Sequence, residues 1–140
     1  QPERSWVTAA GVVLDAASLT ASVLDLPRSP RAELCIRSGY RSLRAIADFY
    51  GIRNDPDPSP DDPISIDRQE FDQACDRLSQ AGVPLVDDRD KAWSDFAGWR
   101  VNYDTVLVTL AGFVMAPYAT WSSDRAPVRP HRAPVRRRRH

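Results

Sequence analysis

The chain has 140 residues and equal numbers of acidic and basic side chains, 19 of each, so its formal net charge is zero. This total hides two segments of opposite sign. Residues 1–124 hold 12 basic and 19 acidic residues, a net charge of −7, whereas residues 125–140 hold seven arginines and no acid. A body with net negative charge does not attract polyanions such as nucleic acids, whereas the basic tail can bind an acidic surface.

The length fits one domain, residues 1–124, which is large enough to bury a hydrophobic core. We expect residues 125–140 to be a disordered arginine-rich tail, because this segment holds three prolines and no apolar periodicity. The sequence shows no signal peptide. It starts with Gln1 and not with an initiator Met, which suggests a piece of a longer protein.

No catalytic motif is present in the body. Both histidines lie in the tail, and no glycine-rich phosphate loop, nucleophile elbow or dinucleotide fingerprint occurs. The carboxylates are scattered over predicted turns, with no acidic pair in a predicted apolar pocket. Cys35 and Cys75 lie in apolar stretches and indicate buried thiols in a reducing compartment, not a disulfide or metal ligands. We therefore expect no enzyme activity, no cofactor and no metal.

The first predicted helix covers residues 5–26, with Ser5 as its cap and Pro27 after its end. Apolar side chains surround it almost completely, which predicts a central position in a bundle. Its length also fits a membrane span. Asp15 and Asp25 are costly in lipid and favour a buried helix of a soluble domain, one that could continue from an upstream membrane segment.

The second predicted helix covers residues 30–50, between a cap at Ser29 and a stop at Gly51. Its expected core face consists of Leu34, Ile36, Tyr40, Leu43, Ile46, Ala47 and Tyr50. Its polar face carries a basic stripe of four arginines, Arg31, Arg37, Arg41 and Arg44. We interpret this stripe as a solvated face that pairs with the acidic body, with nucleic-acid binding as the alternative.

The proline-rich segment 54–66 is predicted to be a rigid acidic connector. Its oxygen-bearing side chains resemble the start of a calcium-binding loop: Asp55, Asp57, Ser59 and Asp61. Pro60 replaces the turn glycine and Ile66 replaces the bidentate Glu, so calcium is not expected.

A third helix is predicted between the capping pair Asp67 and Glu70 and a stop at Gly82. Its expected inward residues are Phe71, Ala74, Cys75 and Leu78. Residues 83–86 are extended but too short to found a sheet. The last helical region begins at Asp87 or Asp88 and runs to Pro117, with a break or kink at Gly98.

An aromatic stripe in this last region comprises Trp93, Phe96, Trp99 and Tyr103, which is more typical of a core than of a ligand cage. The candidate interaction residues are Trp93, Trp99, Arg100, Asn102 and Tyr103, whose polar groups could shape a small pocket. The alternative is that Arg100 pairs with Asp95 or Asp104 while Asn102 caps a turn after Gly98. With no internal repeat, the chain is predicted to be an all-α single compact bundle of four or five helices.

Four consecutive arginines, Arg136, Arg137, Arg138 and Arg139, form the candidate contact with an anionic surface. Such a run fits anionic lipid headgroups. Nucleic acid, an acidic protein and no partner at all are the alternatives.

Several segments together resemble one family. They are LCIRSGY at 34–40, LRAIA at 43–47, DPDPSPDDPI at 55–64, EF at 70–71 before Leu78, and AWSDFAGWRVNY at 92–103. Over residues 6–122 the chain resembles the C-terminal cytoplasmic region of a group of poorly characterised actinobacterial membrane proteins, some of which are similar to two-helix pore (potassium-type) ion channels. The resemblance implies a helical domain behind transmembrane helices that regulates or assembles them, and it implies no catalytic residues.

The resulting expectation is a non-catalytic interaction or regulatory domain of a bacterial integral membrane protein, an ion channel among the candidates, at the cytoplasmic face of the cell membrane. Its expected partners are its own upstream transmembrane segments, anionic lipid headgroups and further copies of itself, with nucleic acid disfavoured. The alternative is a soluble helical adaptor or nucleic-acid-binding protein that acts through the arginine-rich tail.

Overall fold

The structure is a computed structural model that describes residues 2–114. It contains five helices: α1 (Pro2–Ser22), α2 (Pro30–Phe49), α3 (Arg68–Gln80), α4 (Arg89–Arg100) and α5 (Asp104–Phe113). The predicted all-α bundle is confirmed for this part of the chain, where a single bridge between Leu24 and Leu85 is the one β pairing. The predictions for the basic tail, for both histidines and for Pro117 lie outside the described residues.

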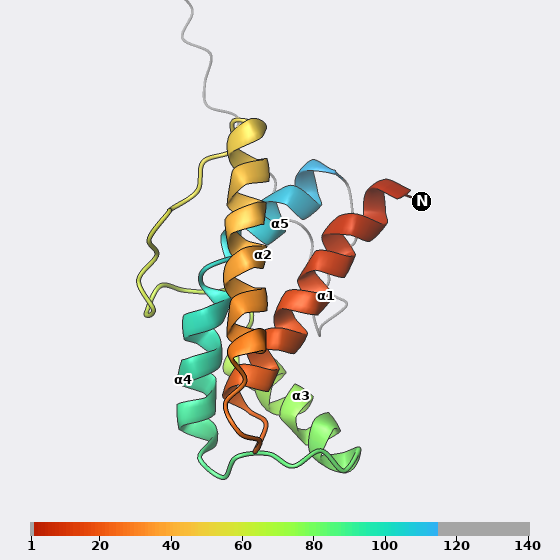
Figure 1. Ribbon diagram of the computed structural model, residues 1–140, viewed down its shortest axis with the longest axis vertical. Helices are drawn as coiled ribbons and strands as arrows, with labels where there is room; N and C mark the ends of the chain where they lie inside the picture. The colour runs from red at the N-terminus through yellow and green to blue at the C-terminus, as the bar shows by residue number, and fades with distance from the viewer. Residues whose placement is uncertain (1, 115–140) are drawn as a thin grey trace, which may run out of the picture.

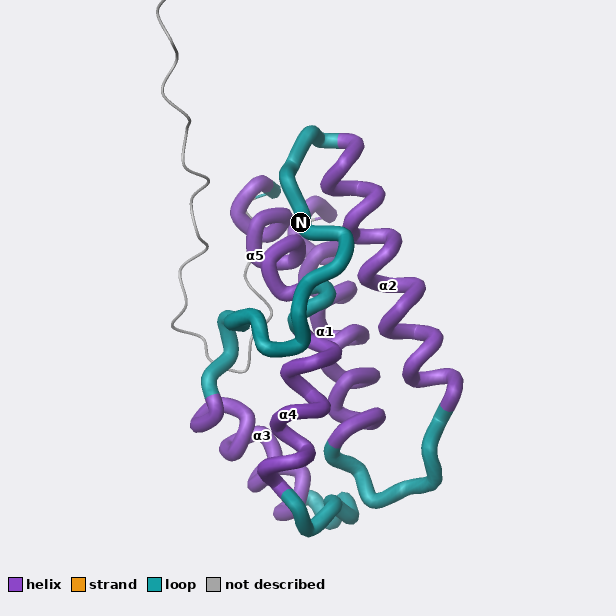
Figure 2. Tube along the Cα trace, turned by 90° about the vertical axis from the view of Figure 1, so that its left-hand side faces the viewer, coloured by secondary structure: helices purple, strands orange, loops and turns teal. Residues whose placement is uncertain are grey.

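The two long helices α1 and α2 cross and form the centre of the molecule (Figure 1). Helix α1 contacts α2, α4 and α5, as expected for a central helix. Figure 2 shows α5 beside the first half of α1, while α3 and α4 lie around its second half. The start of α1, the end of α2 and the end of α5 therefore lie toward the same end of the bundle, where α1 and α2 diverge (Figure 1).

The core has two parts. The first cluster joins α1, α2 and α5 around Leu14, Ile36 and Leu107. The second joins the end of α1 to α3 and α4 around Val23, Phe71 and Phe96. Residues 15–22 of α1 lie between these two clusters in the sequence, and this stretch carries the buried polar residues described below.

Local signals place most helix ends correctly. The caps Ser29, Asp67 and Asp88 each accept a backbone hydrogen bond at the starts of α2, α3 and α4. Gly51 and Gly82 follow α2 and α3 with φ of 68° and 83°, the left-handed conformation that glycine tolerates best.

Three predicted boundaries are wrong. Helix α1 begins at Pro2, so Ser5 lies within the helix and not at its start, in keeping with the preference for proline in a first helical turn. Helix α1 ends at Ser22, four residues early, because the backbone of Val23 and Asp25 pairs with the extended residues 84–86. The last helical region breaks at residues 101–103 and not at Gly98. Asn102 Nδ2 donates to the Gly98 and Trp99 carbonyls at 3.1 and 3.4 Å, which satisfies the end of α4 one turn beyond the glycine.

The predicted core faces need one further correction. Ile36, Leu43 and Ala47 are buried as expected, but Leu34 and Tyr50 on the same helix are exposed. On α1 the side chains of Val12 and Val13 are also exposed, so this helix is covered on only part of its circumference.

Candidate functional site

A buried polar cluster lies at the centre of the molecule and is called here the Arg100 network. It consists of Asp15, Ser18, Ser65, Arg100, Tyr103 and Asp104. The Arg100 side chain is 0% exposed. Its Nη1 donates to Asp15 Oδ1 at 2.6 Å and its Nε donates to Asp104 Oδ1 at 2.7 Å. One guanidinium thus joins α1, α4 and α5 by charge-assisted hydrogen bonds, the stronger kind.

Asp104 is held from two further directions. The backbone N–H of Ser65 donates to Asp104 Oδ2 at 2.9 Å, and the Ser65 hydroxyl donates to Oδ1 at 2.7 Å. Asp104 also lies in the first turn of α5, where the helix dipole favours a negative charge. The carboxylate therefore ties the segment before α3 to the α4–α5 junction.

Asp15 has a different environment. Its Oδ1 accepts from Arg100 and also from the Tyr103 hydroxyl at 2.8 Å. Because the Tyr103 hydroxyl donates there, the Ser18 hydroxyl is the donor in its 2.9 Å contact with Tyr103. Asp15 Oδ2 is buried and has no hydrogen-bond partner in the described structure.

Burial sets the electrostatics of this network. It raises the pKa of Asp15 above its ordinary value, although Arg100 and Tyr103 oppose the change. Burial, with Asp15 beside it, also raises the pKa of Tyr103 well above the usual range. Two carboxyl groups share one guanidinium, so one acidic group is in excess.

The network is sealed by the surrounding helices. Asp15 and Asp104 converge on Arg100 at depth, where a substrate has no access in this structure. The arrangement fixes three helices and matches the alternative in which Arg100 pairs with Asp104. Sequence reasoning placed Asp15 in a buried helix but missed its pairing with Arg100. The available signal was a carboxylate inside an apolar helix, which needs a buried cationic partner.

The structure distributes the five candidate interaction residues over three places. Arg100 and Tyr103 belong to the Arg100 network. Trp93 lies in the second core cluster, with its ring centroid 5.3 Å from that of Phe71. Trp99 and Asn102 line an open pocket of about 720 Å³ between the end of α1, the following loop and α4. These residues therefore do not form one site.

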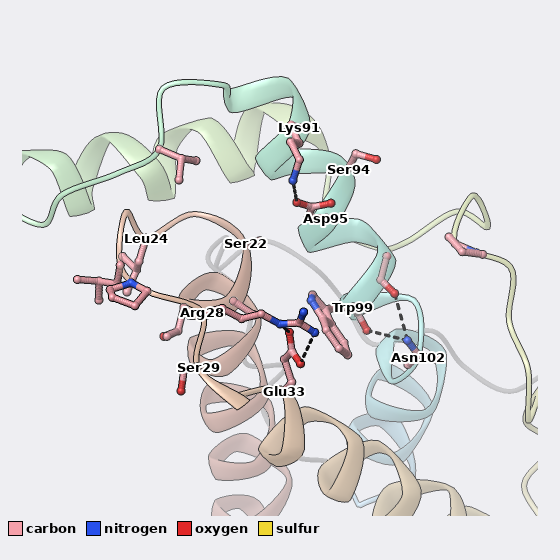
Figure 3. Close-up of a pocket in the computed structure, with 17 residues that line it drawn as sticks. Ser22, Leu24, Arg28, Ser29, Glu33, Lys91, Ser94, Asp95, Trp99 and Asn102 are labelled. Atoms are coloured by element: carbon pink, nitrogen blue, oxygen red, sulfur yellow. Dashed lines mark hydrogen bonds and ion pairs between the residues drawn. The ribbon is translucent and has the colours of Figure 1, made fainter. Parts of the chain in front are cut away.

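The pocket beside Trp99 is shown in Figure 3. The Arg28 guanidinium is bound by both oxygens of Glu33 at 2.7 and 2.9 Å, and the Lys91 ammonium donates to Asp95 at 2.7 Å. Each of these charged residues on the pocket wall is therefore matched by a neighbour on the same wall. The pocket therefore offers polar contacts, but none of these four residues has an unpaired charge that would select an ionic ligand.

The predicted basic stripe on α2 is interrupted. Arg44 donates to the carbonyl of Pro56 and to Asn102, which anchors the acidic connector. The Arg37 guanidinium lies over the Trp99 ring, 5.6 Å from its centroid. Arg31 and Arg41 remain exposed, so the stripe does not present four equivalent arginines to a nucleic acid.

Four exposed aromatic residues, called here the aromatic end, gather where α1 begins and α2 and α5 end: Trp6, Phe49, Tyr50 and Phe113. The Tyr50 ring is 5.2 Å from the Phe49 ring and 5.0 Å from the Phe113 ring, measured between centroids. Trp6 lines a shallow depression together with Phe49 and Tyr50. Phe49 is 84% exposed, which is unusual for so apolar a side chain.

No match to this chain is found among protein-family models, curated proteins or solved structures. Within residues 2–114, no helix combines the length and the apolar character that a membrane span requires. The same residues contain no group of three or more His, Cys, Asp or Glu side chains placed to hold a metal ion.

Proposed function

We propose that this chain is a non-catalytic interaction domain at the cytoplasmic face of a membrane protein, with the aromatic end turned toward the bilayer. The observation that carries the proposal is the gathering of Trp6, Phe49, Tyr50 and Phe113 at one end of the bundle. Aromatic side chains are enriched where proteins meet the membrane–water interface.

The position of the aromatic end supports this orientation. It lies where α1 begins, so a membrane segment preceding the chain would enter there (Figure 1). It also lies where α5 ends, and the chain from there leads to the arginines of residues 125–140. Exposed aromatic rings can contact acyl chains, while arginines elsewhere in the chain can contact anionic headgroups.

The Arg100 network supports the non-catalytic part of the proposal. Its two carboxylates are enclosed and bound to the same guanidinium, an arrangement that positions helices. In the resembled family, the corresponding role is the regulation or assembly of transmembrane segments, an ion channel among them. We carry this role over as part of the proposal.

The test is co-sedimentation of the chain with neutral and with anionic lipid vesicles, at low and at physiological salt. Phe49→Ser removes the most exposed aromatic ring, and burial of such a side chain is worth about 1.5–3 kcal/mol, so the partition coefficient should fall by about tenfold or more. Leu26→Ser is the matched control, because Leu26 is also exposed but follows the opposite end of α1. Equal partitioning of both variants would contradict the proposed orientation.

A further inference from the structure

An apolar groove runs along the junction of α1 and α2. Its volume is about 330 Å³, and its lining includes Val13 of α1 and Cys35 and Ile46 of α2. None of the lining side chains is charged, and Ser42 supplies the one hydroxyl among them. The groove therefore suits an apolar occupant.

The groove opens at the aromatic end. A second depression of about 440 Å³, lined by Phe49 and Tyr50, shares Trp6 and Ile46 with the groove. The groove thus continues the surface proposed to face the bilayer, and its other end lies at Cys35. An occupant that enters at the aromatic end comes directly from the membrane.

The lining favours an acyl chain over an extended peptide. A peptide brings backbone N–H and C=O groups that need hydrogen-bond partners, which an apolar groove does not supply. An acyl chain has no such groups. When a chain leaves the leaflet for the groove, it exchanges one apolar environment for another, while the groove wall loses its contact with water. Covering the wall therefore favours the transfer.

The length of the groove fits one acyl chain. From Ile46 back to Cys35, α2 rises about 17 Å at 1.5 Å per residue. The hydrocarbon core of a bilayer is about 30 Å thick, so one leaflet, and hence one chain, spans about 15 Å. A chain that enters beside Ile46 therefore reaches Cys35 with its terminal carbon.

We propose that the groove between α1 and α2 binds one acyl chain of a bilayer phospholipid, with the ester end of the chain beside the aromatic end and its terminal carbon near Cys35. This inference rests on the proposed membrane orientation and adds one specific lipid contact to it. The bound chain would hold the domain against the bilayer in addition to the aromatic rings.

Two photoactivatable phospholipids separate the groove from the orientation. Both are phosphatidylglycerols with a diazirine on one acyl chain, placed beside the ester in one probe and at the terminal carbon in the other. Each is a trace component of anionic vesicles that are mixed with the full chain and illuminated. Cleavage after arginine puts Cys35 in residues 32–37 and both Phe49 and Tyr50 in residues 45–53, so peptide mass spectrometry locates each adduct.

We expect the ester-end probe to label residues 45–53 and the terminal probe to label residues 32–37. A chain that stays in the leaflet keeps its terminal carbon near the bilayer midplane, about 15 Å below the surface. A domain that inserts to a depth of about 5–10 Å does not reach it there. Labelling of residues 32–37 by the terminal probe is therefore specific for an occupied groove.

Val13→Asp is the test variant and Val12→Asp is its matched control. The two side chains are 53% and 57% exposed, but only Val13 of this pair lines the groove. A carboxylate in the path of the chain is costly to bury, so Val13→Asp should reduce labelling of residues 32–37 by the terminal probe about tenfold. Val12→Asp adds the same charge outside the groove and should leave this labelling unchanged.

The outcomes distinguish the two proposals. Labelling of residues 45–53 by the ester-end probe without labelling of residues 32–37 by the terminal probe would overturn the groove proposal and leave the membrane orientation standing. A second copy or a peptide segment in the groove would give this result. Absence of both signals would contradict the orientation and the groove proposal together. Equal labelling of residues 32–37 in the two variants would also overturn the groove proposal, because the chain would then reach Cys35 by another path.

Discussion

The hydroxyl of Tyr103 donates a hydrogen bond to the carboxylate of Asp15 at 2.8 Å, although the two residues are 88 positions apart in the sequence. Both groups are fully enclosed, and Arg100 binds the same carboxylate oxygen. This contact holds the middle of α1 against the junction of α4 and α5, between the two core clusters. The stability of the bundle therefore depends on one buried polar cluster as well as on apolar packing.

Removal of the Asp15 carboxylate should be costly. Asp15→Ala leaves Arg100 with one carboxylate and leaves the Tyr103 hydroxyl without its acceptor, and breaking a buried pair in this way costs about 3–5 kcal/mol. Asp15→Asn keeps an acceptor oxygen for both donors and should cost about 1–2 kcal/mol. Urea unfolding of both variants measures the difference, and equal losses would show that the hydrogen bonds at Oδ1 do not matter.

The same carboxylate predicts a pH dependence. Because burial raises the pKa of Asp15 in the folded protein above its ordinary value of 3.8, the folded state binds this proton more readily than the unfolded state. The stability that Asp15 contributes is therefore greatest in acid and falls as the pH rises through the pKa of the folded protein.

The native chain should accordingly lose free energy of unfolding relative to Asp15→Asn as the pH is raised from about 4 toward 7. Arg100 and Tyr103 remain in both chains and do not titrate in this interval, and Asp104 is also common to both. Urea unfolding at a series of pH values provides the comparison. A difference that moves in the opposite direction would mean that Arg100 outweighs the burial of Asp15.

Gly39 should be required for the close approach of α1 and α2. A Cβ atom at this position would lie 2.3 Å from Leu14 Cδ2, and Leu14 is itself buried in the core. Gly39→Ala forces a shift in packed side chains, which typically costs about 1–3 kcal/mol and outweighs the gain in helix propensity.

Gly98→Ala is the matched control. Gly98 lies inside α4, and apart from its chain neighbours and the local helix backbone no atom lies within 4 Å of a new Cβ, so alanine should stabilise the protein by up to about 1 kcal/mol. Thermal unfolding should thus move the two midpoints in opposite directions. A lower midpoint for Gly98→Ala, or a higher one for Gly39→Ala, would be inconsistent with this packing.

The helix ends show which features of the fold were predictable from the sequence. The caps at Ser29 and Asp67 were predicted, and Asp88 was one of two candidates, because a cap and its partner are three residues apart. The end of α1 was not, because it depends on backbone pairing with residues 84–86. Local patterns contain no information on a partner 60 residues away.

The Arg100 network was likewise predictable only for its contacts between residues close in sequence. The Arg100–Asp104 pair was open to prediction, since its spacing of four places both residues on neighbouring turns. Asp15 and Ser65 reach Arg100 and Asp104 over 85 and 39 residues, so the full network required the three-dimensional arrangement. Exposure of Phe49 was likewise hidden, because an apolar residue at the end of a helix fits a core equally well.

Deletion of residues 125–140 should leave the thermal midpoint nearly unchanged. The segment contains seven arginines and no apolar periodicity, so its sequence offers little to a packed core. Thermal unfolding of the full and shortened chains tests this expectation. A large decrease in the midpoint would show that the arginines dock on the acidic body.

The most direct test of the proposed membrane orientation removes the basic segment and compares two pairs of exposed apolar residues. In a chain shortened to residue 124, Phe49→Ser with Tyr50→Ser alters the aromatic end, whereas Leu26→Ser with Leu34→Ser alters the opposite end of the bundle. The measurement is the partition coefficient of each variant on anionic vesicles. The account predicts a loss of about tenfold or more for the first pair and little change for the second. Equal partition coefficients would contradict it.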